Sequence, residues 1–136
     1  MMPSSDWEQP ALLDSTRSSI LVVEDEFLIR MLIADELRDA GFNVIEAASA
    51  DDAIAALDSL VPIDLVFSDV KMPGSLDGIG LLAVVRSTFP TLPVIITSAH
   101  LEAASAIADG AARFVPKPYS LLAVVALIRQ ELGQAI

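Results

Sequence analysis

Charged and hydroxyl side chains follow short apolar runs at four places in this chain of 136 residues. Carboxylates stand at the first two places, a hydroxyl at the third and an ammonium at the fourth. In chain order the residues are Glu24, Asp25 and Glu26, then Asp69, then Ser98 with Ala99, and last Lys117 with Pro118. Carboxylates brought close together repel unless a cation lies among them. Oxygen ligands without His or Cys suit a hard ion, so the set predicts a Mg²⁺ or Mn²⁺ site if the fold gathers these residues.

The same side chains suit the transfer of a phosphoryl group. Mg²⁺ is usually held by one or two carboxylates and binds a phosphate oxygen as well. The Lys117 ammonium and the Ser98 hydroxyl are suited to the remaining phosphoryl oxygens. Asp69 would then be the nucleophile and would form an acyl phosphate.

The rest of the sequence predicts a scaffold that gathers the ends of the apolar runs, because such runs alternate five times with segments of helical spacing. The predicted strands are 20–23, 42–47, 63–68, 93–97 and 113–116, and the predicted helices are 26–40, 50–60, 77–89, 101–109 and 121–132. Gly41 is expected to end the first helix and Ser49 to cap the second. The alternation indicates an α/β fold with a parallel sheet and helices on both faces. The carboxyl ends of parallel strands share one edge, where ligands bind.

Four motifs stand at the ends of predicted strands: VVED at 22–25, SDVKMP at 68–73, SA at 98–99 and KPY at 117–119. Each is a weak signal alone, whereas all four in order are a strong one. From Ser19 to Leu132 the chain resembles the receiver domain of two-component response regulators, of the single-domain type. The resemblance implies a flavodoxin-like (βα)5 fold, a doubly wound parallel five-stranded sheet with strand order 2-1-3-4-5.

The resemblance also implies a role for each residue near the acidic motifs. Asp69 matches the phosphoacceptor. Asp25 matches a direct metal ligand, and Glu24 a ligand that acts through water. The backbone carbonyl of Lys71 should complete the protein's share of the coordination. Lys71 and the amide of Ala99 are expected to help bind the phosphoryl group.

The later motifs match the switch and the phosphate contact of the family. Ser98 matches the hydroxyl that turns toward the phosphoryl group, and Lys117 matches the lysine that contacts it. Phe114 stands where an aromatic side chain changes rotamer on activation. Thr97 is the neighbouring alternative for the switch hydroxyl, but counting from Pro93 favours Ser98. Both cannot face the site well, since side chains alternate along a strand.

The resemblance implies that two further residues tune the lifetime of the acyl phosphate, since in the family the residues two positions after the acceptor and after the switch hydroxyl do so. They are Lys71 and His100. If His100 reaches the site, the lifetime should vary between pH 6 and 8.

Two helices carry more apolar residues than a core face needs. The first is expected to turn Ile29, Leu32 and Ile33 inward, which leaves a docking patch for a sensor histidine kinase or a histidine phosphotransferase, made of Phe27, Leu28 and Met31. The alternative is that Trp7, Leu12 or Leu13 covers this patch. The last helix is apolar nearly all round, and its extra residues either form a homodimer face or pack on the sheet: Leu122, Val125 and Leu127.

Composition excludes several classes of function. The net charge is −11, which argues against nucleic acid and against anionic membranes. There is no Cys and a single His, so thiol catalysis, disulfides and His- or Cys-based metal sites are excluded. No apolar run is long enough to span a bilayer, and we expect a cytoplasmic protein. Residues 1–18 are expected to form a flexible extension and residues 19–136 the receiver domain.

The sequence thus predicts a signalling receiver, not an enzyme acting on separate substrates. It should take a phosphoryl group from a phosphohistidine partner onto Asp69 and then bind a downstream protein target. No output domain follows Ile136, so a stand-alone receiver is expected. A non-phosphorylated docking scaffold and a phosphate shuttle or sink stay open. A phosphatase would need a second acid where Lys71 stands, and a nucleotide- or flavin-binding protein would need a Gly-rich loop after the first strand.

Two departures from the family concern segments near the site. The loop PGSLDG, residues 73–78, is one residue longer than the common form. The helix before RFVP is about three residues short, nearly one turn. In the family, that region carries the signal to a partner, so the departures concern the readout of activation.

Overall fold

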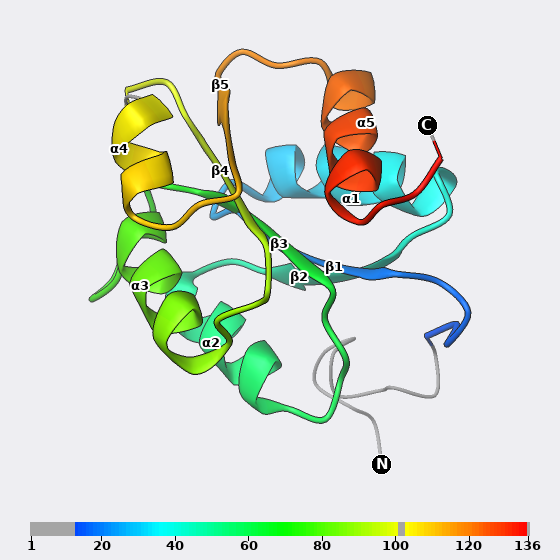
Figure 1. Ribbon diagram of the computed structural model, residues 1–136, viewed down its shortest axis with the longest axis horizontal. Coiled ribbons are helices and arrows are strands. Elements are labelled where there is room, and N and C mark those ends of the chain that lie inside the picture. Colours follow the sequence, from blue (N-terminus) through cyan, green and yellow to red (C-terminus); the bar gives the residue numbers. More distant parts are fainter. Residues whose placement is uncertain (1–12, 101–102, 136) are drawn as a thin grey trace.

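A five-stranded parallel sheet forms the centre of the protein in the computed structural model, which describes residues 13–100 and 103–135 (Figure 1). The strands are β1 (Ser19–Val23), β2 (Asn43–Ala47), β3 (Leu65–Asp69), β4 (Val94–Ser98) and β5 (Arg113–Pro116). Their order across the sheet is β2-β1-β3-β4-β5, and every pairing is parallel. The predicted fold class and strand order are therefore confirmed.

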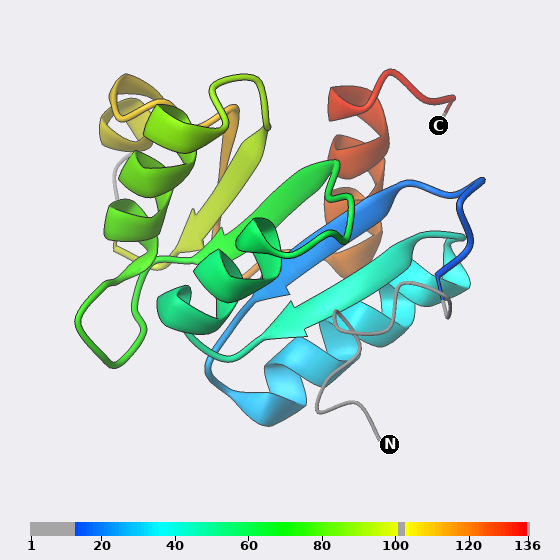
Figure 2. The same ribbon diagram turned by 90° about the horizontal axis from the view of Figure 1, so that it is seen from below.

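Helices cover both faces of the sheet. On one face lie α1 (Phe27–Asp39) and α5 (Leu121–Glu131), and on the other lie α2 (Ala50–Asp58), α3 (Gly78–Thr88) and α4 (Ala103–Ala108) (Figure 2). Within the described residues, no helix combines the length and the apolar character that a membrane crossing requires.

Each strand contributes apolar side chains to two cores, one on either face of the sheet. In β1, Leu21 and Val23 point into the core beneath α2, α3 and α4. Ile20 and Val22 point into the core beneath α1 and α5. All four side chains are 0 to 1% exposed. This alternation explains why the central strands read as continuous apolar runs.

Polar side chains cap two of the helices at their start, and a glycine follows a third. The Ser49 hydroxyl accepts a hydrogen bond from the amide of Asp52 at 3.1 Å, which confirms the predicted cap of α2. The carboxylate of Asp77 accepts one from the amide of Gly80 at 2.9 Å and caps α3 in the same way. After α1 the chain turns at Gly41, whose φ of +98° favours glycine over residues with a side chain.

Some element boundaries differ from the expected ones. Strand β3 begins two residues later than predicted and includes Asp69 as its last residue, opposite Thr97 of β4. Helix α4 was expected over residues 101–109; it covers Ala103–Ala108, and residues 101–102 lie outside the described part of the chain.

One expectation about helix faces is wrong, and one alternative that the sequence left open is narrowed. Leu32 was expected to turn inward but is 56% exposed, because the sheet receives the neighbouring stripe of α1 that contains Ile33 and Leu37. In α5, Val125 and Leu127 pack against the core beneath α1 and α5. Of the three residues considered for a homodimer face, only Leu122 is strongly exposed, at 73%.

The segment just before β1 forms a turn held by a side chain of β2. Asn43 donates from its amide nitrogen to the carbonyl oxygen of Asp14 at 2.7 Å and to that of Arg17 at 3.2 Å. This turn belongs to the 1–18 segment expected to be a flexible extension, of which residues 1–12 lie outside the described residues.

The segments just before β1 and just after α5 meet at the edge where the strands begin. Gln134, beyond α5, donates a hydrogen bond from its side-chain nitrogen to the hydroxyl of Ser18 at 2.8 Å. Ser18 directly precedes β1, so this contact lies at the opposite edge of the sheet from the residues that follow the strands.

Candidate functional site

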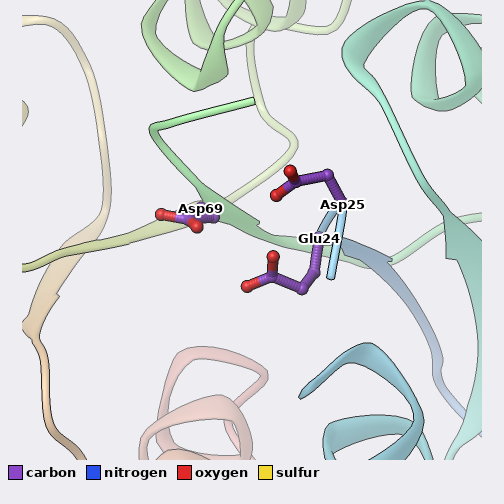
Figure 3. Close-up of side chains that lie close together, drawn as sticks. All are labelled: Glu24, Asp25 and Asp69. Carbon is purple, nitrogen blue, oxygen red and sulfur yellow. The ribbon is translucent and has the colours of Figure 1, made fainter. Parts of the chain in front are cut away.

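Three carboxylates converge where β1 and β3 end side by side (Figure 3). Glu24 and Asp25 follow β1, and Asp69 is the last residue of β3. One oxygen from each lies within 4.8 Å of the other two. The donors are all oxygen atoms, which is the ligand chemistry of Mg²⁺ and Mn²⁺. The residues therefore fit the predicted metal, with Asp25 exposed at the surface and Glu24 buried beneath.

Both carboxylate oxygens of Asp69 are oriented by neighbours. The amide of Val70 donates to Oδ1 at 2.8 Å, and the ammonium of Lys117 donates to Oδ2 at 2.9 Å. The side chain is 9% exposed, so it is held in one orientation with limited access to water. A positioned carboxylate beside an ammonium is suited to attack a phosphorus atom and to hold the group it receives.

Lys117 lies between the two acidic segments. Its Nζ is 2.9 Å from Asp69 and 3.8 Å from Oε1 of Glu24. Burial lowers its pKa, but the hydrogen bond and charge of Asp69 and the charge of Glu24 outweigh this effect, so the pKa is raised overall. The ammonium therefore remains charged at neutral pH. It follows β5 directly and is joined to Pro118 by a cis peptide bond.

Glu24 is the buried acid of the site, at 3% exposure. Burial raises its pKa to about 7, the charge of Asp69 adds to the rise, and a hydrogen bond from the amide of Glu26 opposes it. The ionised form is thus costly even with the Lys117 ammonium 3.8 Å away, and a metal cation would lower that cost.

A hollow of about 280 Å³ opens above these groups. Its lining contains most of the predicted site residues: Asp25, Glu26, Asp69, Lys71, Ser98, Ala99, His100 and Lys117. Lys71 also lines an adjoining hollow of about 350 Å³ with Asp25 and Asp77. The four strand ends therefore meet at one place, as the parallel sheet predicts.

The structure places Ser98, and not Thr97, at this hollow. The Ser98 hydroxyl accepts a hydrogen bond from the amide of His100 at 3.1 Å. Thr97 is 1% exposed, and its hydroxyl has no hydrogen-bond partner among the described residues. Of the two neighbouring hydroxyl residues, Ser98 is therefore the one that lines the hollow.

Helix α3 begins directly against the backbone of Asp69. The amide of Gly78 donates to the carbonyl of Val70 at 2.8 Å. A Cβ atom at position 78 would overlap the carbonyl oxygen of Asp69 and lie 2.7 Å from the Cα of Val70. Only glycine permits this approach, which fixes the backbone that leads from the acceptor residue into the loop.

Three of the predicted functional residues lie on α1, away from the hollow. They form the docking patch, and their exposed fractions are 61% for Phe27, 66% for Leu28 and 36% for Met31. Leu13 packs against the core on the opposite face of the sheet and does not cover the patch. Trp7 and Leu12 lie outside the described residues.

Phe114 also lies outside the hollow. It is half-buried and packs against the core beneath α2, α3 and α4. In this structure the Phe114 side chain is turned inward, and the expected change of rotamer would turn it outward.

Sequence reasoning missed two residues next to the site. Tyr119 meets Phe67 edge to face, with ring centroids 5.9 Å apart, and burial raises its pKa to about 12. With Leu32 and Pro118 it lines an apolar groove of about 410 Å³ between α1 and the start of α5. Arg30 of α1 contacts the backbone of Glu24. Tyr119 could have been recognised from the sequence, because it follows Lys117 and Pro118 in the motif KPY. No sequence pattern distinguishes Arg30 from other arginines.

Known proteins with the same features are similar over most of the chain. The family model described as "Response regulator receiver domain" matches residues 20–129. The DNA-binding transcriptional regulator NtrC of Salmonella typhimurium is 36% identical over 120 residues, which make up 86% of this chain and 25% of that protein. A response regulator described as NtrX-like from Rickettsia felis is 39% identical over 115 residues, 82% of this chain and 24% of that protein.

Solved structures agree with this likeness. The crystal structure of the receiver domain of NtrX from Brucella abortus is 38% identical, with a TM-score of 0.78 over 85% of this chain and 99% of that chain. The curated relatives are longer, and this chain spans about a quarter of their length. With the sheet order, the acidic cluster and the family match in agreement, the chain belongs to the response regulator receiver domain family of two-component systems.

Proposed function

We propose that this receiver domain accepts a phosphoryl group onto Asp69 in a Mg²⁺-dependent reaction, with the phosphohistidine of a sensor histidine kinase or histidine phosphotransferase as donor. The observation that carries the proposal is the meeting of four groups from three strand ends. Asp69 lies within 4.8 Å of ligand oxygens of Glu24 and Asp25 and 2.9 Å from the ammonium of Lys117. Receiver domains as a family bind Mg²⁺ and form a phosphoaspartate.

In the proposed reaction, a carboxylate oxygen of Asp69 attacks the phosphorus atom. An O–P bond forms and the P–N bond of the donor breaks, with its electrons left on the imidazole nitrogen. The other ring nitrogen of the donor already carries a proton, so the group that leaves is a neutral imidazole. Lys117 stabilises the charge on the phosphoryl oxygens, and the hollow leaves room for the group beside Ser98 and Ala99. Mg²⁺ would be held by Asp25 and Asp69, by Glu24 through water and by the carbonyl of Lys71, and when bound it would supply further charge stabilisation.

The phosphoryl group is then lost to water or to another histidine. The domain catalyses only its own phosphorylation and dephosphorylation and is not an enzyme for separate substrates. Before that loss, Ser98 turns toward the phosphoryl group and Phe114 changes its packing, which alters the surface offered to a downstream protein. A partner that donates the group binds at the docking patch on α1, where three apolar side chains are exposed.

The first experiment is intact mass spectrometry after incubation with acetyl phosphate, with and without Mg²⁺. We expect a gain of one phosphoryl group that requires Mg²⁺ and is absent in Asp69→Asn. Asp58→Asn is the matched control, because it makes the same chemical change at an exposed residue that ends α2. If the wild type gains no mass from acetyl phosphate or from a phosphohistidine donor, the domain is a docking module that keeps the fold without phosphorylation.

A further inference from the structure

The guanidinium of Arg30 touches three groups that belong to different parts of the domain. Its Nη1 donates to the backbone carbonyl of Glu24 at 2.8 Å. Its Nε donates to a carboxylate oxygen of Glu46 at 3.3 Å. Its central carbon lies 5.5 Å from the centre of the Phe27 ring, which is a cation–π arrangement. The side chain is 14% exposed, so these contacts are largely shielded from water.

The contact with Glu24 acts on the peptide that joins the two acids of the site. The carbonyl of Glu24 belongs to the peptide that precedes Asp25, and the amide of Glu24 donates to the carbonyl of Ala47 in β2 at 3.0 Å. With the amide tied to β2 and the carbonyl tied to Arg30, this short segment is restrained from both sides. The direction in which the Asp25 carboxylate leaves the backbone depends on that restraint.

Glu46 fixes Arg30 from the edge strand of the sheet. Its second carboxylate oxygen accepts a hydrogen bond from Arg38 at 3.2 Å, so one acid of β2 binds two arginines of α1. The planar guanidinium can serve the carboxylate, the carbonyl and the ring at once, because its donors lie in a fixed plane and its face is free to stack.

We propose that Arg30 is a positioning residue that ties the acid pair to the docking patch, so that the metal site and the Phe27 ring respond to each other. The inference deepens the proposed function and rests on it for the identity of the cation and of the patch. Binding of Mg²⁺ at Glu24 and Asp25 shifts the Glu24 carbonyl and with it the Arg30 guanidinium that donates to it. The shift of the guanidinium in turn moves the Phe27 ring stacked against it. If Mg²⁺ changes the affinity for a partner that binds Phe27, linkage requires that the partner change the affinity for Mg²⁺ by the same factor.

The first test is the affinity for Mg²⁺, measured by calorimetry on the full chain without any phosphoryl donor. Outer-shell partners typically contribute tenfold or more to metal affinity, so Arg30→Gln should weaken Mg²⁺ binding roughly tenfold. Arg38→Gln is the matched control, because it removes the same charge from the same helix and also loses a bond to Glu46; we expect it to change the affinity no more than about twofold. Thermal unfolding of both variants checks that the fold persists.

A second test uses the conservative variant Arg30→Lys. Lysine keeps the charge but lacks the planar fork, so it should leave Mg²⁺ binding nearly as weak as Arg30→Gln does. Full recovery in Arg30→Lys would mean that charge alone acts and would overturn the positioning role. Equal Mg²⁺ affinity in Arg30→Gln and the wild type would overturn it as well.

The coupling is tested by NMR signals of the Phe27 ring during a Mg²⁺ titration. In the wild type these signals should shift with Mg²⁺ occupancy, and in Arg30→Gln at saturating Mg²⁺ the shift should be lost. A shift of equal size in both proteins would show that Arg30 does not couple the metal site to the Phe27 ring. Neither readout needs phosphorylation. A wild type that binds Mg²⁺ but is never phosphorylated would refute the proposed function. The role of Arg30 would still be decided by the Mg²⁺ affinities and the Phe27 signals.

Discussion

The ammonium nitrogen of Lys117 lies 2.9 Å from a carboxylate oxygen of Asp69, although 48 residues separate them in the chain. The bond joins the ends of β3 and β5, which are not neighbours in the sheet, since β4 lies between them. The positive charge of Lys117 therefore already lies beside the acceptor carboxylate.

Lys117→Gln tests this relationship through two opposite effects. Loss of a positive charge beside the acid cluster should tighten Mg²⁺ binding by at least about threefold. Phosphorylation at saturating Mg²⁺ should nevertheless slow by about 10- to 100-fold, because the phosphoryl oxygens lose a fixed positive partner. Calorimetry and the rate of acetyl phosphate incorporation measure the two effects. Arg113→Gln, which removes a charge bound to Glu131 on another surface, should change neither.

The raised pKa of Glu24 predicts how stability depends on pH. Glu24 has a pKa of about 7 in the folded protein against an ordinary value of 4.5, so the folded state binds the proton more tightly than the unfolded state does. The free energy of unfolding should therefore fall as pH rises from about 4.5 to 7 and level off above, by on the order of 2 kcal/mol.

Chemical denaturation at several pH values, without divalent cations, measures this dependence. Glu24→Gln removes the titrating group, so its profile should be flatter over the same range. Saturating Mg²⁺ should also restore stability at pH 8 by binding the ionised site. A wild-type profile parallel to that of Glu24→Gln would contradict the assignment.

Gly78→Ala should displace the backbone of the acceptor residue Asp69. The new methyl group would overlap the backbone of Asp69 and Val70, which cannot move aside as a side chain would, so we expect a loss of about 1–3 kcal/mol in unfolding free energy and slower phosphorylation. Gly80→Ala is the control, because its methyl group would meet the movable end of Leu76. Denaturant titration and the acetyl phosphate rate should separate the two variants clearly.

Leu28→Ser should separate the docking of a partner from the chemistry of the site. Leu28 is 66% exposed and makes no part of the hollow, so acetyl phosphate should phosphorylate the variant at the normal rate. Transfer from a phosphohistidine protein should slow, because apolar contact area with that protein is lost. Leu60→Ser provides the control, since Leu60 is 95% exposed and lies beyond α2 on the other face of the sheet. Equal transfer rates in both variants would place the partner elsewhere.

The lifetime of the acyl phosphate is expected to depend on His100. This residue is exposed and lines the hollow together with Asp69, where the attacking water must enter. Decay of the phosphorylated mass over time gives the lifetime. In His100→Gln the lifetime should change, and an unchanged lifetime in that variant would remove His100 from the reaction.

The sequence predicted the strand ends well because each apolar run is short and stops at a polar residue. Asp69 and Lys117 could be placed together once the sheet was recognised as parallel, since all such ends share an edge. Leu32 was misplaced because helical spacing defines a stripe but not the few tens of degrees by which tertiary packing turns it. Arg30 could not be identified, because one partner is a backbone carbonyl and the other, Glu46, lies on a different element.

The hydrogen bond between Gln134 and Ser18 makes the domain a candidate for protein engineering. Positions 18 and 134 lie side by side at the edge opposite the acidic cluster, so a short linker between them would close the chain into a ring without touching the hollow. New termini opened at the exposed Leu60 would give a circular permutant with the same sheet. Inserting the domain into a host protein through the same two positions would bring the host's own segments together, leaving the acidic edge facing solvent.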